Sequence, residues 1–297
     1  MTTSGGAAKS GAHTTRGVCV PRVVAQALRH RDSFQAVRGY LGTVLEDFFW
    51  LQFAVKWGFK KVPIVDVDHP LDDEVPFAPD KVGAYLDFVA YWIRPLGYIG
   101  RRFGDDAQRR YAVAFLRLID RCYREAADVY RFRLSTTRRP RYYKGRFLVI
   151  RLFDPHYLCV PSLHVMIVVL AYTFYRRAFA ELGVTGDEAA DLDRELFGGA
   201  VKITETVLYI KQHSVNCIPA ALYAMSRITP DAVTASEVDA FIDRLFVDAP
   251  LLAEGTDDRI RASIRDVFGR LTADGRTDAD WTPAVRRFLL ACQQRDF

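Results

Sequence analysis

Residues 155–175 contain no Lys, Arg, Asp or Glu, and this uncharged run constrains the fold more than any other part of the sequence. It is about as long as a helix that crosses a bilayer. It also contains prolines and two histidines, however, and Arg176 and Arg177 follow it directly. A second uncharged run, 212–226, is too short to span a membrane. Because the other helical segments are rich in charge, we interpret both runs as buried core helices of a soluble or peripheral membrane protein, with an integral membrane protein as the alternative.

Apolar residues recur at helical spacing through most of the remaining sequence, which predicts an all-α fold. The expected helical regions are 34–59, 79–92, 107–131, 161–182 and 187–225, with three shorter helices after residue 229. Pro95 is expected to interrupt the chain after the second region, and either the Gly-Gly pair at 198–199 or the segment 214–219 is expected to break the fifth. The Pro- and Asp-rich segment 60–79 predicts a loop with at most a short strand at 62–67.

Composition divides the chain into three parts. Residues 1–17 are rich in Thr, Ser, Gly and Ala and lack the apolar core of a signal peptide, so they are predicted to be a disordered leader. Residues 18–228 are predicted to form the main helical bundle. The pattern changes to short amphipathic segments after Pro230, so residues 229–297 are predicted to form a small C-terminal helical extension.

The cysteines and the charge limit the class of protein. The five cysteines are scattered and form no CxxC pair, which predicts reduced thiols in a cytoplasmic setting, with neither a disulfide framework nor a zinc site. Asp66, Asp68 and His69 lie close together in the expected loop, but this pattern is common in solvated acidic loops, and no metal site is predicted there. The net charge of +5 is modest and gives no overall nucleic-acid signature.

The segment 131–151 is strongly basic and contains no acidic residue. Its eight cations are Arg131, Arg133, Arg138, Arg139, Arg141, Lys144, Arg146 and Arg151. Such a segment can bind phosphates, whether of a small substrate, of lipid headgroups or of nucleic acid. No recognised nucleic-acid module surrounds it, which argues against nucleic acid as a partner. A solvated loop without a specific ligand is the structural alternative.

Two histidine motifs follow the basic segment. In Pro161-Ser162-Leu163-His164, the proline suits the first turn of a helix, and Ser162 and His164 would then lie where free backbone N–H groups and the helix dipole favour an anion. The second motif is Lys211-Gln212-His213. Either histidine taken alone is more often a structural residue than a catalytic one.

Taken in order, the basic segment and the two motifs resemble the type 2 phosphatidic acid phosphatase/haloperoxidase superfamily, whose pattern is Lys-x6-Arg-Pro, Pro-Ser-Gly-His and Ser-Arg-x5-His-x3-Asp. The resemblance covers 131–222 and is that of a divergent member. Arg139-Pro140, Pro161 to His164 and His213 match the pattern. The residues that depart from it are Phe132 in place of the lysine, Thr206 and Val207 in place of Ser-Arg, and Cys217 in place of the aspartate.

The resemblance implies a helical bundle and phosphoryl transfer without a metal or another cofactor. His213 would attack phosphorus and form a phosphohistidine, and His164 would protonate the leaving alkoxide. Ser162 and the N–H groups at the helix start would bind phosphate oxygens, and the charge would be neutralised by Arg139 with Lys211 and Arg138. The expected substrate is a phosphate ester, with a lipid phosphate as the favoured class; the sequence gives no oligomeric state.

The residues that depart from the family pattern lead to an alternative prediction of function. Cys217 cannot supply the carboxylate that would orient His213, so Asn216, Glu205 or a backbone carbonyl would have to replace it. Val207 cannot clamp phosphate as an arginine does. The alternative is therefore a catalytically lapsed relative that binds phosphate-bearing ligands or anionic membrane through the segment 131–151, and a helical scaffold with purely structural histidines is the third possibility. A working site should place the ring nitrogens of the two histidines about 4–8 Å apart in one pocket, with Arg139 pointing into it.

Overall fold

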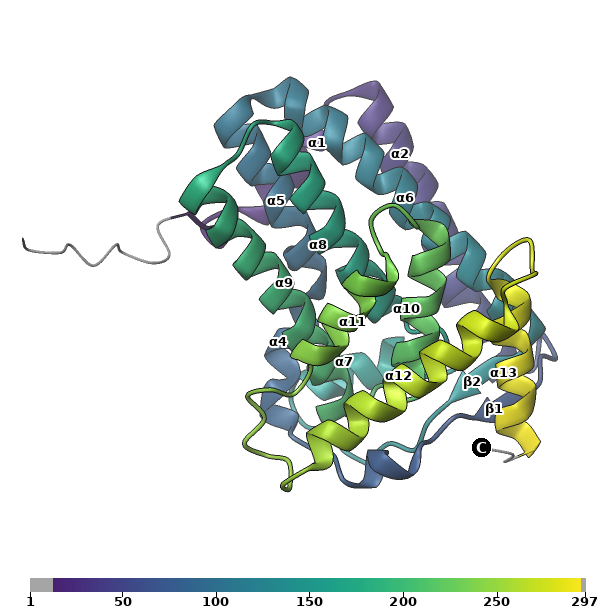
Figure 1. The fold of residues 1–297 in the computed structure, drawn as a ribbon. Coiled ribbons are helices and arrows are strands. Elements are labelled where there is room, and N and C mark those ends of the chain that lie inside the picture. The colour runs from purple at the N-terminus through teal and green to yellow at the C-terminus, as the bar shows by residue number, and fades with distance from the viewer. Residues whose placement is uncertain (1–12, 295–297) are drawn as a thin grey trace, which may run out of the picture.

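The computed structural model describes residues 13–294, and this part of the chain is mostly helical, as the apolar periodicity predicts (Figure 1). The α-helices are α1 (Val20–Ala27), α2 (Arg31–Thr43), α3 (Leu51–Lys56), α4 (Val82–Leu86), α5 (Phe88–Phe103), α6 (Asp105–Phe132), α7 (Arg146–Phe153), α8 (Leu163–Glu181), α9 (Gly186–Tyr209), α10 (Cys217–Ile228), α11 (Ala235–Arg244), α12 (Thr256–Asp274) and α13 (Thr282–Gln294). A π-helix, η1 (Val44–Trp50), joins α2 to α3, and two short 3-10 helices are η2 (Pro70–Asp73) and η3 (Pro79–Lys81). The strands are β1 (Ile64–Asp66) and β2 (Leu134–Thr136).

Helix α8, which contains most of the uncharged run, is the central helix of the bundle and packs against α5, α6, α9 and α10. Of the helices in residues 13–294, α8 is the one long and apolar enough to cross a membrane, and 72% of its apolar window is buried inside the protein. The buried polar groups on α8 find partners in the bundle; for example, the hydroxyl of Tyr175 donates to the carbonyl oxygen of Trp92 at 2.8 Å. This burial favours a core helix, the interpretation preferred from the sequence.

One expected helix break is wrong, and the structure has only one of the two alternative breaks expected in the fifth region. Pro95 lies inside α5, where the neighbouring side chains of Trp92 and Leu96 are buried, so tertiary packing retains a helix that the proline weakens. The Gly-Gly pair at 198–199 lies inside α9. A Cβ added at Gly199 would lie 2.7 Å from the ring of Tyr91, so glycine there leaves room for this ring of α5 against α9. The chain instead breaks between α9 and α10, at the other expected position.

A two-stranded parallel sheet holds the segment that precedes α8. In β1, Ile64 pairs with Leu134 of β2, which confirms the short strand expected at 62–67. Ser135 of β2 forms a further bridge to Leu158, and its hydroxyl accepts a hydrogen bond from the N–H of Val160 at 2.7 Å. The basic segment is therefore not a simple loop, since it contains β2 and α7.

The C-terminal helices pack on the bundle. Helices α11 to α13 lie across α10 and the end of α6 (Figure 1), and Phe241, Ile264 and Trp281 belong to the same hydrophobic core as α8. Most of the predicted leader lies outside the described residues. Its last part, 13–17, contacts α9, because the hydroxyl of Thr15 is buried and donates to Glu195 at 2.8 Å.

Candidate functional site

His213 lies in the turn between α9 and α10, and the end of α9 explains how this turn forms. Lys211 has a positive φ of 55°, and the N–H groups of Lys211 and Gln212 donate to carbonyl oxygens in the last turn of α9. This pair of hydrogen bonds is the Schellman arrangement, in which glycine is the usual left-handed residue. The ammonium group of Lys211 donates to the carbonyl oxygens of Asp72 and Val75, which anchors the lysine in this conformation.

Ser162 and His164 come from the start of α8 and meet His213 beside a cavity. Ser162 is the N-cap of α8, and its hydroxyl accepts a hydrogen bond from the N–H of Val165 at 3.4 Å. The same hydroxyl lies 3.2 Å from Nε2 of His213, and Nδ1 of His164 lies 3.4 Å from this nitrogen. Pro161 precedes the N-cap, so its predicted position in the first helical turn is wrong.

The imidazole rings of His164 and His213 lie closer together than the separation predicted for a site that holds a phosphate between them. Their facing nitrogens are 3.4 Å apart, which is shorter than the expected separation of about 4–8 Å. The ring centroids are 5.5 Å apart, and the ring of His164 also stacks on that of Tyr85 with a centroid distance of 4.6 Å. A phosphoryl group therefore fits at Nε2 of His213 only if the ring of His164 moves aside.

A backbone carbonyl orients His213. Nδ1 of His213 lies 3.2 Å from the carbonyl oxygen of Cys159. Because a carbonyl oxygen only accepts hydrogen bonds, Nδ1 carries the proton and the lone pair of the neutral ring is on Nε2. Burial lowers the pKa of His213 well below its usual range, and the neighbouring His164 lowers it further, so the ring is neutral at pH 7.

Three groups could replace the motif aspartate beside His213: Asn216, Glu205 or a backbone carbonyl. Of these three groups, only the backbone carbonyl contacts the His213 ring in the described part of the chain. The side-chain amide of Asn216 donates to the carbonyl oxygen of Val67 at 3.1 Å. The carboxylate of Glu205 accepts the N–H of Phe246 at 2.6 Å. The thiol of Cys217 accepts a backbone N–H from its own turn at 3.3 Å.

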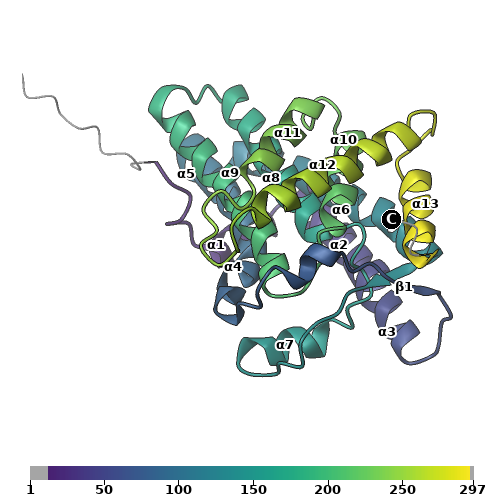
Figure 2. The same ribbon diagram turned by 60° about the horizontal axis from the view of Figure 1, so that its bottom comes forward.

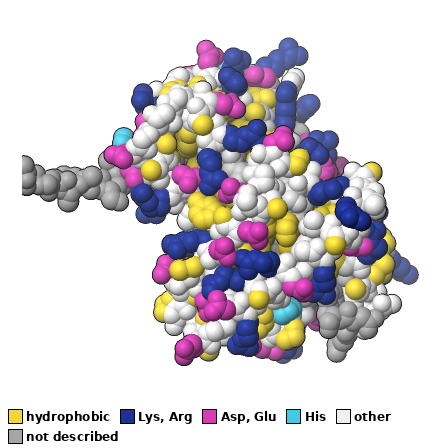
Figure 3. Space-filling view, viewed as in Figure 1, with side chains coloured by type: hydrophobic (Ala, Val, Ile, Leu, Met, Phe, Trp, Pro, Cys, Tyr) yellow, Lys and Arg dark blue, Asp and Glu magenta, His cyan; other side chains and the backbone are white. Residues whose placement is uncertain are grey.

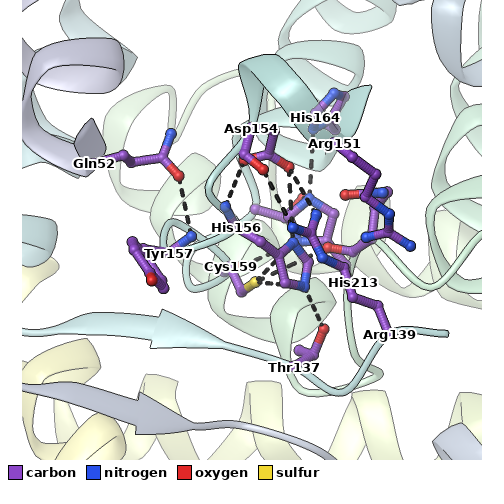
Figure 4. Close-up of polar contacts among 12 residues, drawn as sticks. Gln52, Thr137, Arg139, Arg151, Asp154, His156, Tyr157, Cys159, His164 and His213 are labelled. Carbon is purple, nitrogen blue, oxygen red and sulfur yellow. Dashed lines mark hydrogen bonds and ion pairs between the residues drawn. The ribbon is translucent and has the colours of Figure 1, made fainter. Parts of the chain in front are cut away.

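Asp154 is the centre of a second polar cluster next to the two histidines (Figure 4). Its carboxylate accepts the backbone N–H of His156 at 2.9 Å and lies 3.8 Å from Nδ1 of that ring. The guanidinium group of Arg139 lies 3.7 Å from the same carboxylate, and Nε2 of His156 lies 2.8 Å from the hydroxyl of Thr137. Burial acts to raise the pKa of Asp154, but its contacts with His156 and the charge of Arg139 outweigh burial and lower this pKa to about 2.

Two guanidinium groups lie near this one carboxylate, which leaves an excess of positive charge. Burial lowers the pKa of Arg139, and burial with the charge of Arg139 lowers the pKa of Arg151 to about 10, so both remain cations at pH 7. Arg151 donates to the carbonyl oxygen of Pro140 at 3.1 Å. Nη1 of Arg139 and Nη1 of Arg151 are buried without a hydrogen-bond partner in residues 13–294. A bound anion would satisfy such N–H groups.

His164 and His213 line a cavity of about 430 Å³ with mostly apolar walls. The other lining residues are Tyr40, Val44, Phe48, Phe49, Tyr85, Leu86, Phe88, Val89, Tyr123, Val149, Ile150, Phe153, Asp154, His156, Leu158, Cys159, Leu163 and Gln212. Gln212 is only 2% exposed, and its amide oxygen and nitrogen both lack a hydrogen-bond partner in the described part of the chain. Leaving a buried amide unpaired costs about 1–3 kcal/mol, so Gln212 is suited to bind a polar group in the cavity.

The imidazoles of this region are held neutral. Burial lowers the pKa of His164 to about 4, although the charge of Asp154 acts in the opposite direction. Burial also lowers the pKa of His156, against the effect of the same carboxylate. At pH 7 the fixed charges near the cavity therefore come from the arginines and Asp154. Among residues 13–294, no group of three or more His, Cys, Asp or Glu side chains is arranged to hold a metal ion.

None of the four predicted phosphate-binding residues lines the cavity: Ser162 and Arg139 lie beside it, and Arg138 and Lys211 are paired elsewhere. Arg138 is exposed, and its guanidinium group pairs with Asp68 at 2.6 Å and with Asp73 at 3.2 Å. Lys211 is occupied by the carbonyl oxygens of Asp72 and Val75. The structure thus brings together His213, His164 and Ser162, with Arg139 in the adjoining cluster, and assigns Lys211 a structural role.

The site also contains residues to which the sequence motifs assign no role. Asp154, His156, Arg151 and Gln212 all lie in or beside the cavity. One signal was present in the sequence, since Asp154 is the first carboxylate after the basic segment and is followed within two residues by a histidine. The role of Gln212 depends on its burial without a partner, which local sequence does not reveal.

We compared the chain with protein-family models, with curated proteins and with solved structures. None of the three comparisons finds a match for this chain.

Proposed function

We propose that this chain is a phosphatase or phosphotransferase that acts on a phosphate ester, with a lipid phosphate as the favoured class, through a phosphohistidine on His213. The observation that carries the proposal is the tautomer of this residue. The carbonyl oxygen of Cys159 holds the proton on Nδ1, so Nε2 carries the lone pair; it accepts the hydroxyl of Ser162 at 3.2 Å and becomes available to a substrate when that hydroxyl turns away. A neutral, oriented imidazole is a competent nucleophile at pH 7.

The proposed reaction has two steps. The Nε2 lone pair of His213 forms a bond to phosphorus while the ester P–O bond breaks, and the leaving alkoxide takes a proton from His164. Nδ1–H of the resulting imidazolium remains hydrogen-bonded to the carbonyl of Cys159. Water, or the hydroxyl of an acceptor, then attacks phosphorus, loses its proton to His164 and releases His213. Arg139 and Arg151 lie in the cluster beside the cavity and would neutralise the phosphoryl oxygens, since Nη1 of each lacks a hydrogen-bond partner among the described residues.

The protonation state of His164 sets a condition for this mechanism. Its pKa of about 4 in the free protein leaves it neutral at pH 7. A phosphate dianion beside the ring favours the charged form and raises this pKa. Substrate binding must therefore both displace the His164 ring from His213 and protonate it. The apolar walls of the cavity favour an ester with an apolar alcohol, such as a lipid phosphate.

The test is the substitution His213→Ala, assayed by phosphate release from p-nitrophenyl phosphate and from phosphatidic acid. We expect turnover to fall to background, because the residue that forms the covalent intermediate is lost. His30→Ala is the matched control, since His30 lies at the start of α2 and does not line the cavity. Unchanged turnover in His213→Ala would contradict the proposal.

Binding without turnover is the second candidate, and the low pKa of His164 favours it, since a neutral imidazole cannot donate the proton to a leaving group. It predicts that the protein binds inorganic phosphate but releases none from either ester. Titration with phosphate, followed through the imidazole C–H signals in proton NMR, distinguishes the two candidates. Shifts that disappear in Arg139→Ala, with no turnover in the wild type, would support binding alone.

A further inference from the structure

The mouth of the cavity lies between three elements that expose apolar side chains. Val149 and Phe153 of α7, Leu86 at the end of α4 and Val89 at the start of α5 all line the cavity. Each of them is also exposed, with exposed fractions between 43% for Leu86 and 60% for Phe153. Apolar side chains grouped around an opening in this way mark a surface that contacts another apolar phase or partner.

Helix α7 turns an apolar face to solvent. Leu148 and Leu152, one helical turn apart, are 46% and 59% exposed, whereas Phe147 and Ile150 are buried on the opposite side. In Figure 2, α7 projects from the lower side of the bundle and has few helices around it. A short helix whose outer face is apolar and whose flanks are basic is typical of segments that lie in the interface of a bilayer.

A second exposed apolar group lies on η1, α3 and the loop that follows. Trp50, Trp57 and Phe59 are 55%, 57% and 73% exposed, and the rings of Trp50 and Phe59 stack with centroids 6.4 Å apart. Figure 2 shows α3 projecting from the same lower side as α7, so one flat surface can contact both. Tryptophan is favoured at the boundary between lipid tails and water because its ring is large and carries a single polar N–H group.

Free cations accompany both apolar groups. In the basic segment, Arg131, Arg138 and Arg139 are paired with carboxylates, but no partner is found for Arg141, Lys144 or Arg146 anywhere in residues 13–294. Near α3, the exposed cations Lys56, Lys60 and Lys61 form no ion pair with any described residue. By contrast, the face that carries α9, α11 and α12 shows cationic and anionic side chains interspersed (Figure 3).

We propose that one surface of the protein, which we call the docking face, binds an anionic lipid bilayer. The docking face consists of α7, of Trp50, Trp57 and Phe59 in and after η1 and α3, and of the exposed residues at the cavity mouth. The apolar side chains enter the interface, the free cations contact anionic headgroups, and the cavity then opens toward the lipid. This docking does not depend on the proposed chemistry, although it would place a lipid phosphate at the cavity mouth. Each free cation is expected to strengthen binding about fivefold near an anionic surface.

The experiment uses the full chain and its own tryptophans. Trp92 and Trp281 are 6% and 1% exposed, so lipid contact is reported by Trp50 and Trp57. We expect vesicles of phosphatidylcholine and phosphatidylserine to sediment the protein, and brominated lipids in them to quench its tryptophan fluorescence. Vesicles of phosphatidylcholine alone should bind much less, and added salt should weaken binding to the anionic vesicles.

Two sets of variants test the docking face, and a third is the control. Leu148→Glu with Leu152→Glu should weaken vesicle binding at least about tenfold, because two charges would enter the apolar region. Replacing Arg141, Lys144 and Arg146 with Ala should weaken it on the order of a hundredfold. Val247→Glu with Leu251→Glu is the matched control, since these residues are similarly exposed, at 49% and 46%, but lie between α11 and α12. The control should bind as the wild type does.

Three outcomes would overturn the inference. One is the absence of sedimentation with anionic vesicles, and another is an equal loss of binding in the control. The third is a wild-type dimer that Leu148→Glu with Leu152→Glu converts to a monomer, without vesicle binding, which would assign the face to a second copy of the chain. His213→Ala must bind vesicles as the wild type does, because the docking face is unchanged in this variant. Hydrolysis of p-nitrophenyl phosphate needs no membrane. The two assays therefore distinguish a failure of docking from a failure of the proposed chemistry.

Discussion

Ser162 is fully buried at the start of α8, and its hydroxyl has two partners. It accepts the N–H of Val165, which caps the helix, and its proton is directed at Nε2 of His213. A serine next to a histidine also resembles a nucleophile and its base. Ser162 does not line the cavity, however, and no substrate atom can reach it there without a rearrangement. Its hydroxyl is therefore interpreted as positioning His213.

Ser162→Ala tests this role. We expect the free energy of unfolding to fall by about 1 kcal/mol, because one helix cap is lost. Phosphate release should fall by less than about a hundredfold, since the nucleophile of the proposed mechanism is retained. Urea unfolding and the p-nitrophenyl phosphate assay measure the two effects. Complete loss of turnover in a folded variant would instead identify Ser162 as the nucleophile.

At the scale of the elements, the packing of Tyr91 from α5 on α9 depends on one glycine. Gly199 faces the ring of Tyr91, whose hydroxyl donates to the carbonyl oxygen of Leu196 at 2.7 Å. Gly198, its neighbour in the same helix, has no atom within 4 Å of the place where a Cβ would be added. The two glycines look alike in the sequence but have different roles.

Gly199→Ala and Gly198→Ala therefore form a matched pair. We expect Gly199→Ala to lower the free energy of unfolding by about 1–3 kcal/mol, because the methyl group overlaps the ring of Tyr91. Gly198→Ala should raise it by up to about 1 kcal/mol through the higher helix propensity of alanine. Thermal or urea unfolding of both variants gives the comparison. Equal effects at the two positions would contradict the close packing of Tyr91 against Gly199.

The elements also show what the sequence could predict. Helical periodicity predicted the helices α6 and α8 close to their bounds, because each buries one face or its whole surface. The breaks were less predictable, since Pro95 and Gly199 are retained inside helices by packing against distant residues. The basic segment was misleading for the same reason. Arg131 pairs with Asp47, and Arg138 with Asp68, and such partners are far away in the sequence.

Of the candidate site, the sequence predicted the pairing of His164 with His213 and the nearby Arg139. It could not predict the carbonyl of Cys159 as the orienting group, because any backbone position has a carbonyl. It also could not reveal the unpartnered amide of Gln212. Both depend on the turn after α9, whose conformation is set by the anchored Lys211.

At the scale of the whole molecule, buried titratable groups act on stability in opposite directions. The folded-state pKa of His164 is lowered to about 4, so the unfolded chain binds its proton first as the pH falls below about 6.5. This histidine therefore destabilises the folded protein in mild acid. Burial raises the pKa of Asp72 to about 6, so the folded state binds that proton first, and Asp72 acts in the opposite direction.

His164→Gln isolates one of these contributions. Between pH 7 and pH 5, the wild type should lose about 1–2 kcal/mol of stability through His164 alone, since only the unfolded state is protonated there. The variant should lack this loss, so its free energy of unfolding should depend less steeply on pH. Urea unfolding at both pH values, with His30→Gln as the control, measures the difference. A steeper dependence in His164→Gln would contradict the lowered pKa.

The pairing of β1 with β2, and of Ser135 with Leu158, has a consequence for the growing polypeptide. A chain synthesised as far as Leu158 contains all three paired segments but lacks α8, α9 and the turn with His213. Helices α5 and α6 would then expose the faces that α8 later covers. Long-range contacts of this kind form slowly, so we expect the first half of the chain to need protection from aggregation until the ribosome has completed α10.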